Sequence, residues 1–400
     1  MRLLICAGGT GGGVYPALAV VQALESEDSP STSLRTGPGV KIHEDRGVGD
    51  EHENVDILWV GGSGGMEADL VRRQGLAYQG IPAAGMHGVG IRSMPWNLWQ
   101  VGRGLMAARR LLRQFRPDVL FFTGGYVAVP LALAARLPGL GIPVPANLLY
   151  VPDIEPGWAL KTLSRFAEHI ALTVADSKSY FKSTKDITVT GYPTRQDLRV
   201  WNKSSALQFL KLSPELPILL VVGGSTGARS INRALSAILP ELLEEMQVVH
   251  LAGKRDWVEV DQAKENLREA QRSRYRAFPY LHAEMGAALT AADLVLSRAG
   301  ASSLGEYPLF GLPAILVPYP YAWRYQEVNA RYLARREAAV ILDDRDLQDS
   351  LLPIVLDLIR DQSRREKMSQ AMARLARPEA ANSIGSLLYK LAGERSRRKV

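Results

Sequence analysis

The sequence contains a single cysteine among its 400 residues. A lone cysteine forms no internal disulfide, which fits a reducing compartment, and Cys6 stands in an apolar run without an activating neighbour. No apolar run approaches the roughly 18 to 20 residues that cross a bilayer, and the N-terminus lacks a secretory signal. These absences predict a cytoplasmic protein without a membrane span.

The sequence also lacks the signatures of two common nucleotide sites. The Walker pattern G-x-x-x-x-G-K-[ST] is absent, and no acidic residue ends the second predicted strand to bind a ribose, which disfavours ATP hydrolysis and NAD binding. Residues 26–55 are rich in Gly, Pro, Ser and charge and predict a flexible surface insertion. Its His43 and His52 have acidic neighbours but lack the helical spacing of metal ligands, so we expect a solvated loop and no metal site. Since neither nucleotide signature is present, we also expect no cofactor.

The charge balance points to anionic partners. The chain carries a net charge of +7, which suits nucleic acid, anionic lipid or phosphorylated substrates without choosing among them. With 46% hydrophobic and 22% charged residues, the chain has an ordinary globular composition, and its length predicts two domains.

Short apolar runs that end in glycine or proline alternate with helix-like segments along the whole chain, which is typical of parallel sheets covered on both faces. The runs are RLLICAGG, DILWVGGSGG, DVLFFTGG, NLLYVPD, DITVTGYP, PILLVVGG, MQVVHLAGK, ADLVLSRAG, PAILVPYP and AAVILDD. We expect an α/β fold with two doubly wound Rossmann-like domains, at residues 1–195 and 196–377. Residues 378–400 predict a final helix that packs back on the first domain.

Each half opens with a glycine loop between a strand and a helix, at Gly8–Gly13 and at Gly223–Arg229. A bare loop at a helix start lets backbone N–H groups approach an anion closely. The sequence therefore predicts two anion sites.

Eight motifs in order resemble the MurG family of glycosyltransferases. They read GGTGGGVYPALAV, MEADLV, TGGYVAVP, GYPTR, VVGGSTGAR, SRAGASSLGE, GLPAILVPYP and QEVNA. The family attaches N-acetylglucosamine to the undecaprenyl-linked muramyl-pentapeptide precursor of peptidoglycan. The resemblance implies the GT-B fold, with two Rossmann-like domains facing each other across a cleft, and UDP-N-acetylglucosamine as the donor substrate.

The resemblance implies a donor site in the second domain. The loop would bind the donor diphosphate, Glu306 the ribose hydroxyls, and the backbone at Leu281 the uracil, while Arg298 lies near the base or forms an ion pair. Tyr325 stands where the family has the first of two adjacent glutamines. The donor residues expected in this way are Arg195, Gly224, Ser225, Thr226, Gly227, Leu281, Arg298, Ser302, Glu306, Gln326 and Asn329.

The resemblance also implies an acceptor site in the first domain, for a polyprenyl diphosphate. Its expected residues are Thr10, Gly11, Gly12, Gly13, Gly124, Gly125 and Tyr126. The segment from Gly85 to Arg116 combines apolar residues with arginines, which suits an anionic membrane surface, although a core helix with a solvated basic face has the same pattern. The expected patch is Met94, Trp96, Trp99 and Arg103, on a protein peripheral to the cytoplasmic face of the membrane.

Two acceptor-side motifs depart from the family pattern. The last loop residue is Gly13 where the family has histidine, and YVPD at Tyr150–Asp153 replaces HEQN. Transfer with inversion needs a base near the acceptor hydroxyl. Asp153 and His87 are the leading candidates, with Glu155 a third.

These departures leave alternatives open. A related UDP-sugar transferase with another lipid-linked acceptor, or a silent nucleotide-sugar-binding protein, fits the same residues. An epimerase on this fold has different motifs. Nucleic-acid binding needs basic patches with stacking aromatics. The arginine-rich stretch from Gly85 to Arg116 is the only candidate in the sequence, and we expect no nucleic-acid partner.

Overall fold

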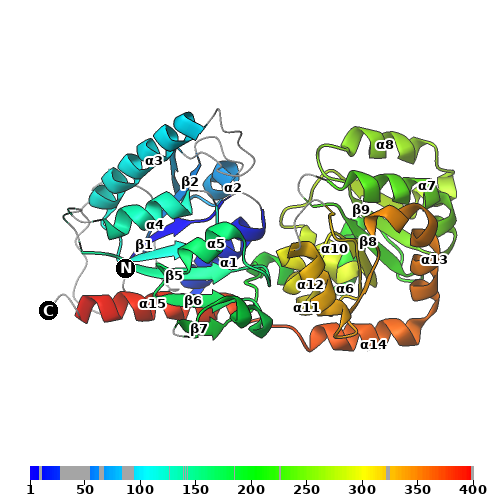
Figure 1. Cartoon of the computed structure of the whole chain (residues 1–400). Coiled ribbons are helices and arrows are strands. Elements are labelled where there is room, and N and C mark those ends of the chain that lie inside the picture. Colours follow the sequence, from blue (N-terminus) through cyan, green and yellow to red (C-terminus); the bar gives the residue numbers. More distant parts are fainter. Residues whose placement is uncertain are drawn as a thin grey trace, which may run out of the picture. The chain divides into compact units, whose positions relative to one another are not determined.

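The structure, a computed structural model, describes residues 1–8, 11–27, 55–62, 67–82, 94–125, 127–137, 139, 141, 143–183, 185–224, 227–320 and 325–397. The chain divides into two compact units (Figure 1). Unit 1 comprises Met1–Pro152, Pro156–Pro193 and Glu379–Val400, and unit 2 comprises Asp153–Glu155 and Thr194–Pro378. The short segment Asp153–Glu155 thus belongs to unit 2, although the residues on either side of it belong to unit 1.

Unit 1 contains a seven-stranded parallel sheet in the order β3-β2-β1-β4-β5-β6-β7. The strand order reverses at β1, which pairs with β2 on one side and β4 on the other. Continuous apolar runs form the central strands because both of their faces are covered. The strands are β1 (Arg2–Cys6), β2 (Asp56–Gly62), β3 (Ala77–Ile81), β4 (Val119–Phe122), β5 (Ala146–Val151), β6 (His169–Leu172) and β7 (Asp186–Val189).

Helices cover both faces of this sheet. Leu3 and Ile5 point to a core shared with α1 and α15, whereas Leu4 and Cys6 point to a core shared with α3, α4 and α5. The helices are α1 (Gly11–Glu27), α2 (Glu67–Arg73), α3 (Met94–Phe115), α4 (Ala128–Arg136), α5 (Trp158–Leu163) and α15 (Ala380–Arg397), with a 3₁₀ turn η2 (Ala175–Tyr180).

The helix α15 comes from the far end of the chain. Its Ile384 and Leu388 are fully buried in the same core as β1 and α1. This helix, red in Figure 1, packs on α1 and contacts the strands β4 and β5 of unit 1. The last helix therefore completes the fold of the first unit.

Unit 2 contains a six-stranded parallel sheet in the order β10-β9-β8-β11-β12-β13. The strand order reverses at β8, between β9 and β11. The strands are β8 (Ile218–Val222), β9 (Gln247–Leu251), β10 (Tyr275–Phe278), β11 (Leu294–Ser297), β12 (Ala314–Leu316) and β13 (Ala339–Ile341).

The main core of unit 2 lies between this sheet and the helices α7, α8 and α13. On the other side, α6 packs on α10, and α10 contacts β8. The helices are α6 (Lys203–Leu210), α7 (Arg229–Glu245), α8 (Trp257–Glu265), α9 (Glu269–Arg272), α10 (Met285–Ala291), α11 (Glu306–Phe310), α12 (Tyr325–Ala334), α13 (Leu347–Arg360) and α14 (Gln362–Ala373), with 3₁₀ turns η3 (Gln196–Arg199), η4 (Ala301–Leu304) and η5 (Asp344–Asp346).

The predicted fold class, two Rossmann-like doubly wound units, is confirmed. Each of the ten apolar runs forms a strand. The structure adds β3, β6 and β10, which the sequence pattern did not reveal.

Candidate active site

The glycine loop of unit 2 follows β8, where the strand order of its sheet reverses. Such a switch point is where open α/β sheets bind ligands, outside the carboxyl ends of the strands. Gly224 and Gly227 adopt φ angles of +79° and +86°, which side chains with a Cβ rarely adopt. The loop leads into the 17-residue helix α7. Ser225 and Thr226 lie outside the described residues.

Glu306 begins α11, on the turn that follows the neighbouring strand β11. Burial raises the pKa of its carboxyl to about 7, the guanidinium of Arg195 opposes the shift, and the carboxylate of Asp197 adds to it. Ser302 lies in the same turn, in η4, and is partly buried. The ends of the neighbouring strands β8 and β11 therefore bring the glycine loop and the Glu306 carboxyl to the same edge of the sheet.

Arg195 is held in a fixed orientation next to Glu306. One terminal nitrogen forms a 2.8 Å ion pair with Asp197, and the other donates a 3.0 Å hydrogen bond to the carbonyl of His282. Its side chain is only 13% exposed. Leu281, whose backbone was expected to bind uracil, is buried immediately before His282. Asp197 was not singled out from the sequence, and its place two residues after Arg195 was the available signal.

Arg298 forms the ion pair that was one of its two expected roles. Its guanidinium lies 2.5 Å from Asp344 and donates to the hydroxyl of Ser230 at 2.7 Å and to the carbonyl of Val317 at 3.1 Å. The ring of Tyr319 lies 5.2 Å from the guanidinium. In this structure Arg298 therefore ties β11 to η5, and its charge is already partnered.

The two polar residues of α12 are also engaged. Gln326 accepts a 2.9 Å hydrogen bond from the backbone of Tyr319. The fully buried Asn329 donates to Asp153 at 2.8 Å and to the carbonyl of Ala299 at 3.1 Å, and it accepts from the backbone of Ile154 at 3.2 Å. Both N–H groups of the Asn329 amide are thus used, so a hydrogen bond from this amide to a sugar would require one of these two bonds to break.

Asp153 thus lies beside α12 in unit 2. Burial raises the pKa of its carboxyl, and the hydrogen bond from Asn329 partly offsets this. The phenol of Tyr325 lies near enough that the carboxylates of Glu155 and Asp153 help raise its pKa, after burial. Asp153 is therefore a partly buried carboxylate with a raised proton affinity, as a general base requires.

The glycine loop of unit 1 lies at the reversal point of its own sheet. Gly124 and Gly125 have φ angles of +130° and +92°, and a Cβ added at Gly125 would lie 3.2 Å from the backbone nitrogen of Gly8. Only glycine permits this close approach of two chain segments. Gly11 and Gly12 belong to the start of α1. Thr10, Tyr126 and His87 lie outside the described residues.

Gly13, where the family has histidine, is buried against Thr123. The Thr123 hydroxyl donates a 2.8 Å hydrogen bond to the Gly13 carbonyl, and a Cβ added at Gly13 would lie 3.2 Å from that hydroxyl oxygen. The space next to the loop is therefore occupied in this chain.

Behind the loop lies the buried carboxylate of Glu67, from the MEADLV motif. It accepts a 3.1 Å hydrogen bond from the backbone of Gly62 and would lie 2.8 Å from a Cβ on Gly8. Although the motif was recognised, no role was predicted for this residue, because sequence alone does not show which way the carboxylate points.

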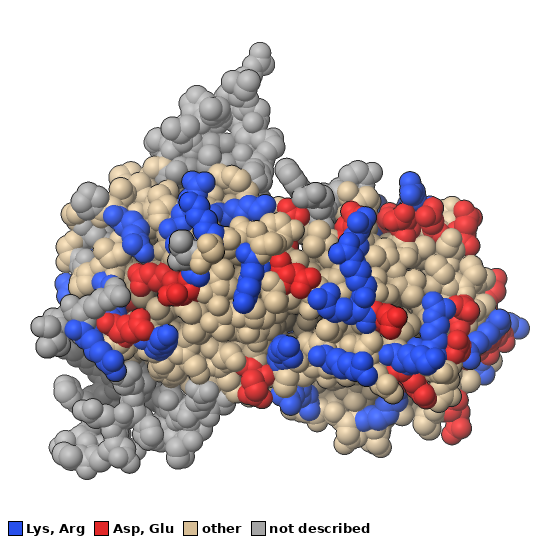
Figure 2. Space-filling model, turned by 60° about the horizontal axis from the view of Figure 1, so that its bottom comes forward, with Lys and Arg blue, Asp and Glu red and all other residues tan. Residues whose placement is uncertain are grey.

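The helix α3 begins at Met94, and the side chains of Met94, Trp96 and Trp99 are outside the description. Further along α3, Arg103 is exposed and Met106 is 66% exposed. No helix among the described residues is long and apolar enough to cross a membrane. Figure 2 shows Lys and Arg side chains interspersed with Asp and Glu on the face it draws, rather than a surface of one sign.

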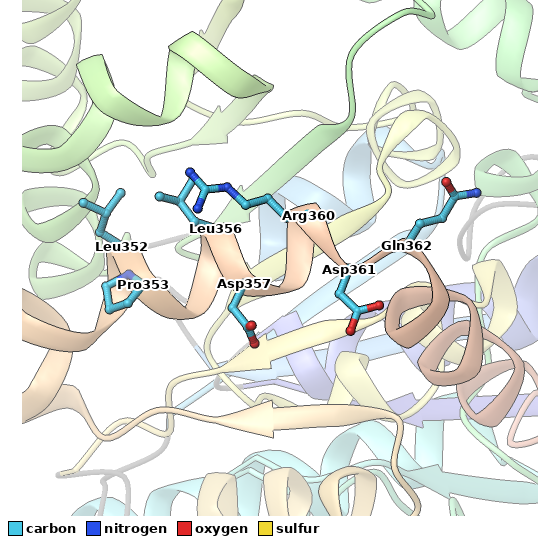
Figure 3. Close-up of a pocket in the computed structure, with 7 residues that line it drawn as sticks. All are labelled: Leu352, Pro353, Leu356, Asp357, Arg360, Asp361 and Gln362. Atoms are coloured by element: carbon cyan, nitrogen blue, oxygen red, sulfur yellow. The ribbon is translucent and has the colours of Figure 1, made fainter.

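A surface groove lies on α13 and the start of α14 (Figure 3). Leu352, Pro353 and Leu356 line it, together with Asp357 and Arg360, and none of its lining residues comes from a glycine loop. The groove is separate from the candidate site of unit 2.

Comparisons with known proteins identify the family. Residues 46–172 match the model of the glycosyltransferase family 28 N-terminal domain, and residues 218–384 match the family 28 C-terminal domain. The chain is 40% identical to the UDP-N-acetylglucosamine–N-acetylmuramyl-(pentapeptide) pyrophosphoryl-undecaprenol N-acetylglucosamine transferase of Roseiflexus sp. (strain RS-1), over 98% of this chain and 95% of the relative. It is 35% identical to the enzyme of the same name from Desulforamulus reducens, over 98% and 99%.

Solved structures agree at the level of the fold. The MurG of Acinetobacter baumannii superposes with a TM-score of 0.70 at 23% identity, over 97% of this chain and 99% of that one. A UDP-GlcNAc 2-epimerase from Neisseria meningitidis, bound to UDP-GlcNAc, gives 0.64 at 13% identity, over 98% and 100%. The matched domains and the near full-length relatives show that this chain belongs to the MurG family of glycosyltransferases.

Proposed function

We propose that this protein transfers N-acetylglucosamine from UDP-N-acetylglucosamine to muramyl-pentapeptide pyrophosphoryl-undecaprenol, the step from lipid I to lipid II in peptidoglycan synthesis. Family membership supports the reaction. The observation that carries it to this chain's own residues is that Arg195 contacts the backbone next to Leu281 and lies near Glu306. Glu306 in turn follows β11, the strand next to β8 and its glycine loop.

The donor would bind unit 2 in three places. The ionised carboxylate of Glu306 can accept hydrogen bonds from both ribose hydroxyls. The loop from Gly224 to Gly227 and the start of α7 offer N–H groups and a helix dipole to the diphosphate. As the glycosidic bond to UDP breaks, negative charge grows on this diphosphate, so the same groups stabilise the leaving group.

The acceptor chemistry requires a base. Asp153 is our first candidate because its carboxyl is partly buried and its pKa is raised, with Asn329 holding one oxygen in place. It would take the proton of the acceptor hydroxyl as that oxygen attacks the anomeric carbon from the face opposite UDP, which inverts the configuration. His87 is the second candidate. The acceptor diphosphate would bind the glycine loop of unit 1.

The acceptor is lipid-linked, so we also propose that the protein works at the cytoplasmic face of the membrane. The exposed Arg103 and Met106 of α3 support this, since cations and apolar side chains together favour an anionic bilayer surface.

Incubation of the purified protein with UDP-GlcNAc and a short-chain lipid I analogue tests the reaction. We expect UDP release that depends on the acceptor, and a product heavier by one N-acetylhexosamine. Gly13 in place of histidine favours one alternative, a different lipid-linked acceptor. Binding of UDP-GlcNAc without turnover of the lipid I analogue would support that alternative against our proposal.

A further inference from the structure

A chain of buried polar side chains runs through the core of unit 2 behind the glycine loop. His250 on β9 is fully buried, with its Nδ1 2.7 Å from the hydroxyl of Tyr275 and its Nε2 3.0 Å from Oδ1 of Asn232. The amide nitrogen of Asn232 lies 2.9 Å from the carbonyl of Ala252 and 3.0 Å from Oδ2 of Asp256. Four buried polar side chains are thus connected from β10 to the start of α8.

The direction of every hydrogen bond in this chain is determined. Burial lowers the pKa of His250 to about 3, so the ring is neutral and carries one N–H. Asn232 uses its amide nitrogen for Ala252 and Asp256, so its oxygen must accept from Nε2–H of His250. Nδ1 of His250 therefore accepts from Tyr275. A network with a single satisfied arrangement is rigid, because any reversal would leave a buried group unpaired.

The network ends against the last glycine of the loop. The Asp256 carboxylate is only 3% exposed. A Cβ added at Gly227 would lie 2.8 Å from the carbonyl of Ala252 and 3.1 Å from Oδ2 of Asp256. The Ala252 carbonyl and Oδ2 of Asp256 therefore have two roles. They accept the hydrogen bonds of the Asn232 amide, and they leave no room for a side chain at Gly227, whose φ is +86°.

The other oxygen of Asp256 contacts Arg229, the first residue of α7. Nε of Arg229 lies 3.2 Å from Oδ1 of Asp256, while the Arg229 side chain is 56% exposed. The Nε–H edge of the guanidinium is thus bonded to a buried carboxylate. The rest of the side chain is exposed at the start of α7, two residues after Gly227.

We propose that Asp256 is a positioning residue for the donor diphosphate: it fixes the turn at Gly227 and orients the guanidinium of Arg229 toward that diphosphate. This inference rests on the proposed donor site, and it adds Arg229 as a diphosphate-binding side chain that acts with the backbone of the loop. A guanidinium held by one carboxylate loses less freedom when it binds a phosphate than a free one does.

Calorimetric titration with UDP and with uridine tests it, because uridine has no diphosphate. We expect Asp256→Asn and Arg229→Gln each to weaken UDP binding about tenfold, the size of one charge-assisted hydrogen bond, and to leave uridine binding unchanged. The double variant should lose no more than either single one, since both act through the same contact. Arg229→Gln alters a half-exposed side chain, so it keeps the test valid if Asp256→Asn folds poorly.

The matched control is Arg233→Gln. Arg233 stands one helical turn further along α7 and pairs with Glu259 at 3.0 Å, both side chains being exposed. We expect no change in UDP affinity. In turnover, Asp256→Asn should raise KM for UDP-GlcNAc and leave KM for the acceptor unchanged.

Three results would overturn the inference. If the variants bind UDP and uridine equally more weakly, the substitution damages the unit in general. If both variants keep the UDP affinity of the unaltered protein, neither residue acts on the diphosphate. If Arg233→Gln also loses UDP affinity, the effect is a non-local one of charge. Failure of the unaltered protein to bind either UDP or uridine would remove the donor site itself.

Discussion

The amide of Asn329 donates a 2.8 Å hydrogen bond to the carboxylate of Asp153, a residue 176 positions earlier in the chain. Both residues belong to unit 2. The same amide holds the backbone of Ile154 and the carbonyl of Ala299. One fully buried side chain therefore fixes the segment that carries our candidate base.

Replacing Asn329 should destabilise unit 2. Asn329→Ala leaves the Ile154 N–H, the Ala299 carbonyl and the Asp153 carboxylate without this partner, and we expect a loss of about 2–4 kcal/mol in the free energy of unfolding. Urea unfolding measures it. Asn382→Ala, which removes an exposed 2.7 Å bond to Glu379, is the control and should cost under about 0.5 kcal/mol. Similar losses in the two variants would show that the Asn329 network contributes little.

Asp153→Asn tests the base. The variant keeps the shape of the side chain and removes its proton affinity, so we expect kcat to fall by about 10²–10⁴-fold with little change in KM for UDP-GlcNAc. His87→Gln serves as the comparison. If His87→Gln loses activity and Asp153→Asn keeps it, His87 is the base and our first candidate is wrong.

The carboxyl of Glu306 should make stability depend on pH. Its pKa is about 7 in the folded protein, above the ordinary value of 4.5, so the fold favours the protonated form. This stability is complete below pH 4.5 and is lost as pH rises through 7. At pH 8, Glu306→Gln should therefore be more stable than the unaltered protein by about 1–3 kcal/mol, and at pH 4.5 the two should be equal.

The same substitution should abolish the pH dependence of UDP binding. In the unaltered protein the ionised carboxylate binds the ribose, so affinity should fall by up to about tenfold for each pH unit below 7. Calorimetry at pH 6 and 8 measures both effects. Glu259→Gln, at an exposed carboxylate, should change neither, and a flat pH profile for the unaltered protein would contradict the ribose assignment.

Restoring the family histidine at Gly13 should strain the loop. A Cβ there meets the Thr123 hydroxyl at 3.2 Å, and crowding of this kind costs about 1–3 kcal/mol. We expect Gly13→His to lower the melting temperature and Thr123→Ala, in the same chain, to recover part of the loss. If Gly13→His has an unchanged melting temperature and a higher activity, the loop has not adapted to glycine, and Gly13 only lowers the activity.

The arginines of α3 should govern binding to anionic bilayers. Arg103 and Arg110 both lie on α3 and are exposed. Reversing both charges together should weaken binding to vesicles of phosphatidylglycerol and phosphatidylcholine at least about tenfold. Sedimentation with the vesicles measures it. Arg331→Glu with Arg345→Glu, two exposed arginines of unit 2, gives the same change in net charge, and an equal loss there would mean that net charge alone matters.

Apolar runs predicted the strands because a parallel strand buried on both faces must be apolar throughout. The apolar pattern did not predict β3, β6 and β10, and the reason is physical. β3 and β10 are edge strands with partly exposed faces, and β6 has only four residues, HIAL, so none shows a long apolar run.

The candidate site was only partly predictable in the same way. Glycine loops and Glu306 follow strand ends, so the sequence locates them. The partner of each polar side chain depends on the tertiary structure. Arg298 forms an ion pair with Asp344, and Asn329 forms a hydrogen bond with Asp153, and neither pair is close in sequence. The network behind Gly227 joins residues from four separate segments, and no local pattern encodes it.

The last helix has a consequence for how the chain is made. The core of unit 1 includes Ile384 and Leu388, so this core stays incomplete until α15 has left the ribosome. The strands of unit 1 are synthesised before unit 2, but the apolar surface that α15 covers is buried only after Thr194–Pro378 of unit 2 have been synthesised. The nascent chain therefore exposes that apolar surface throughout the synthesis of unit 2.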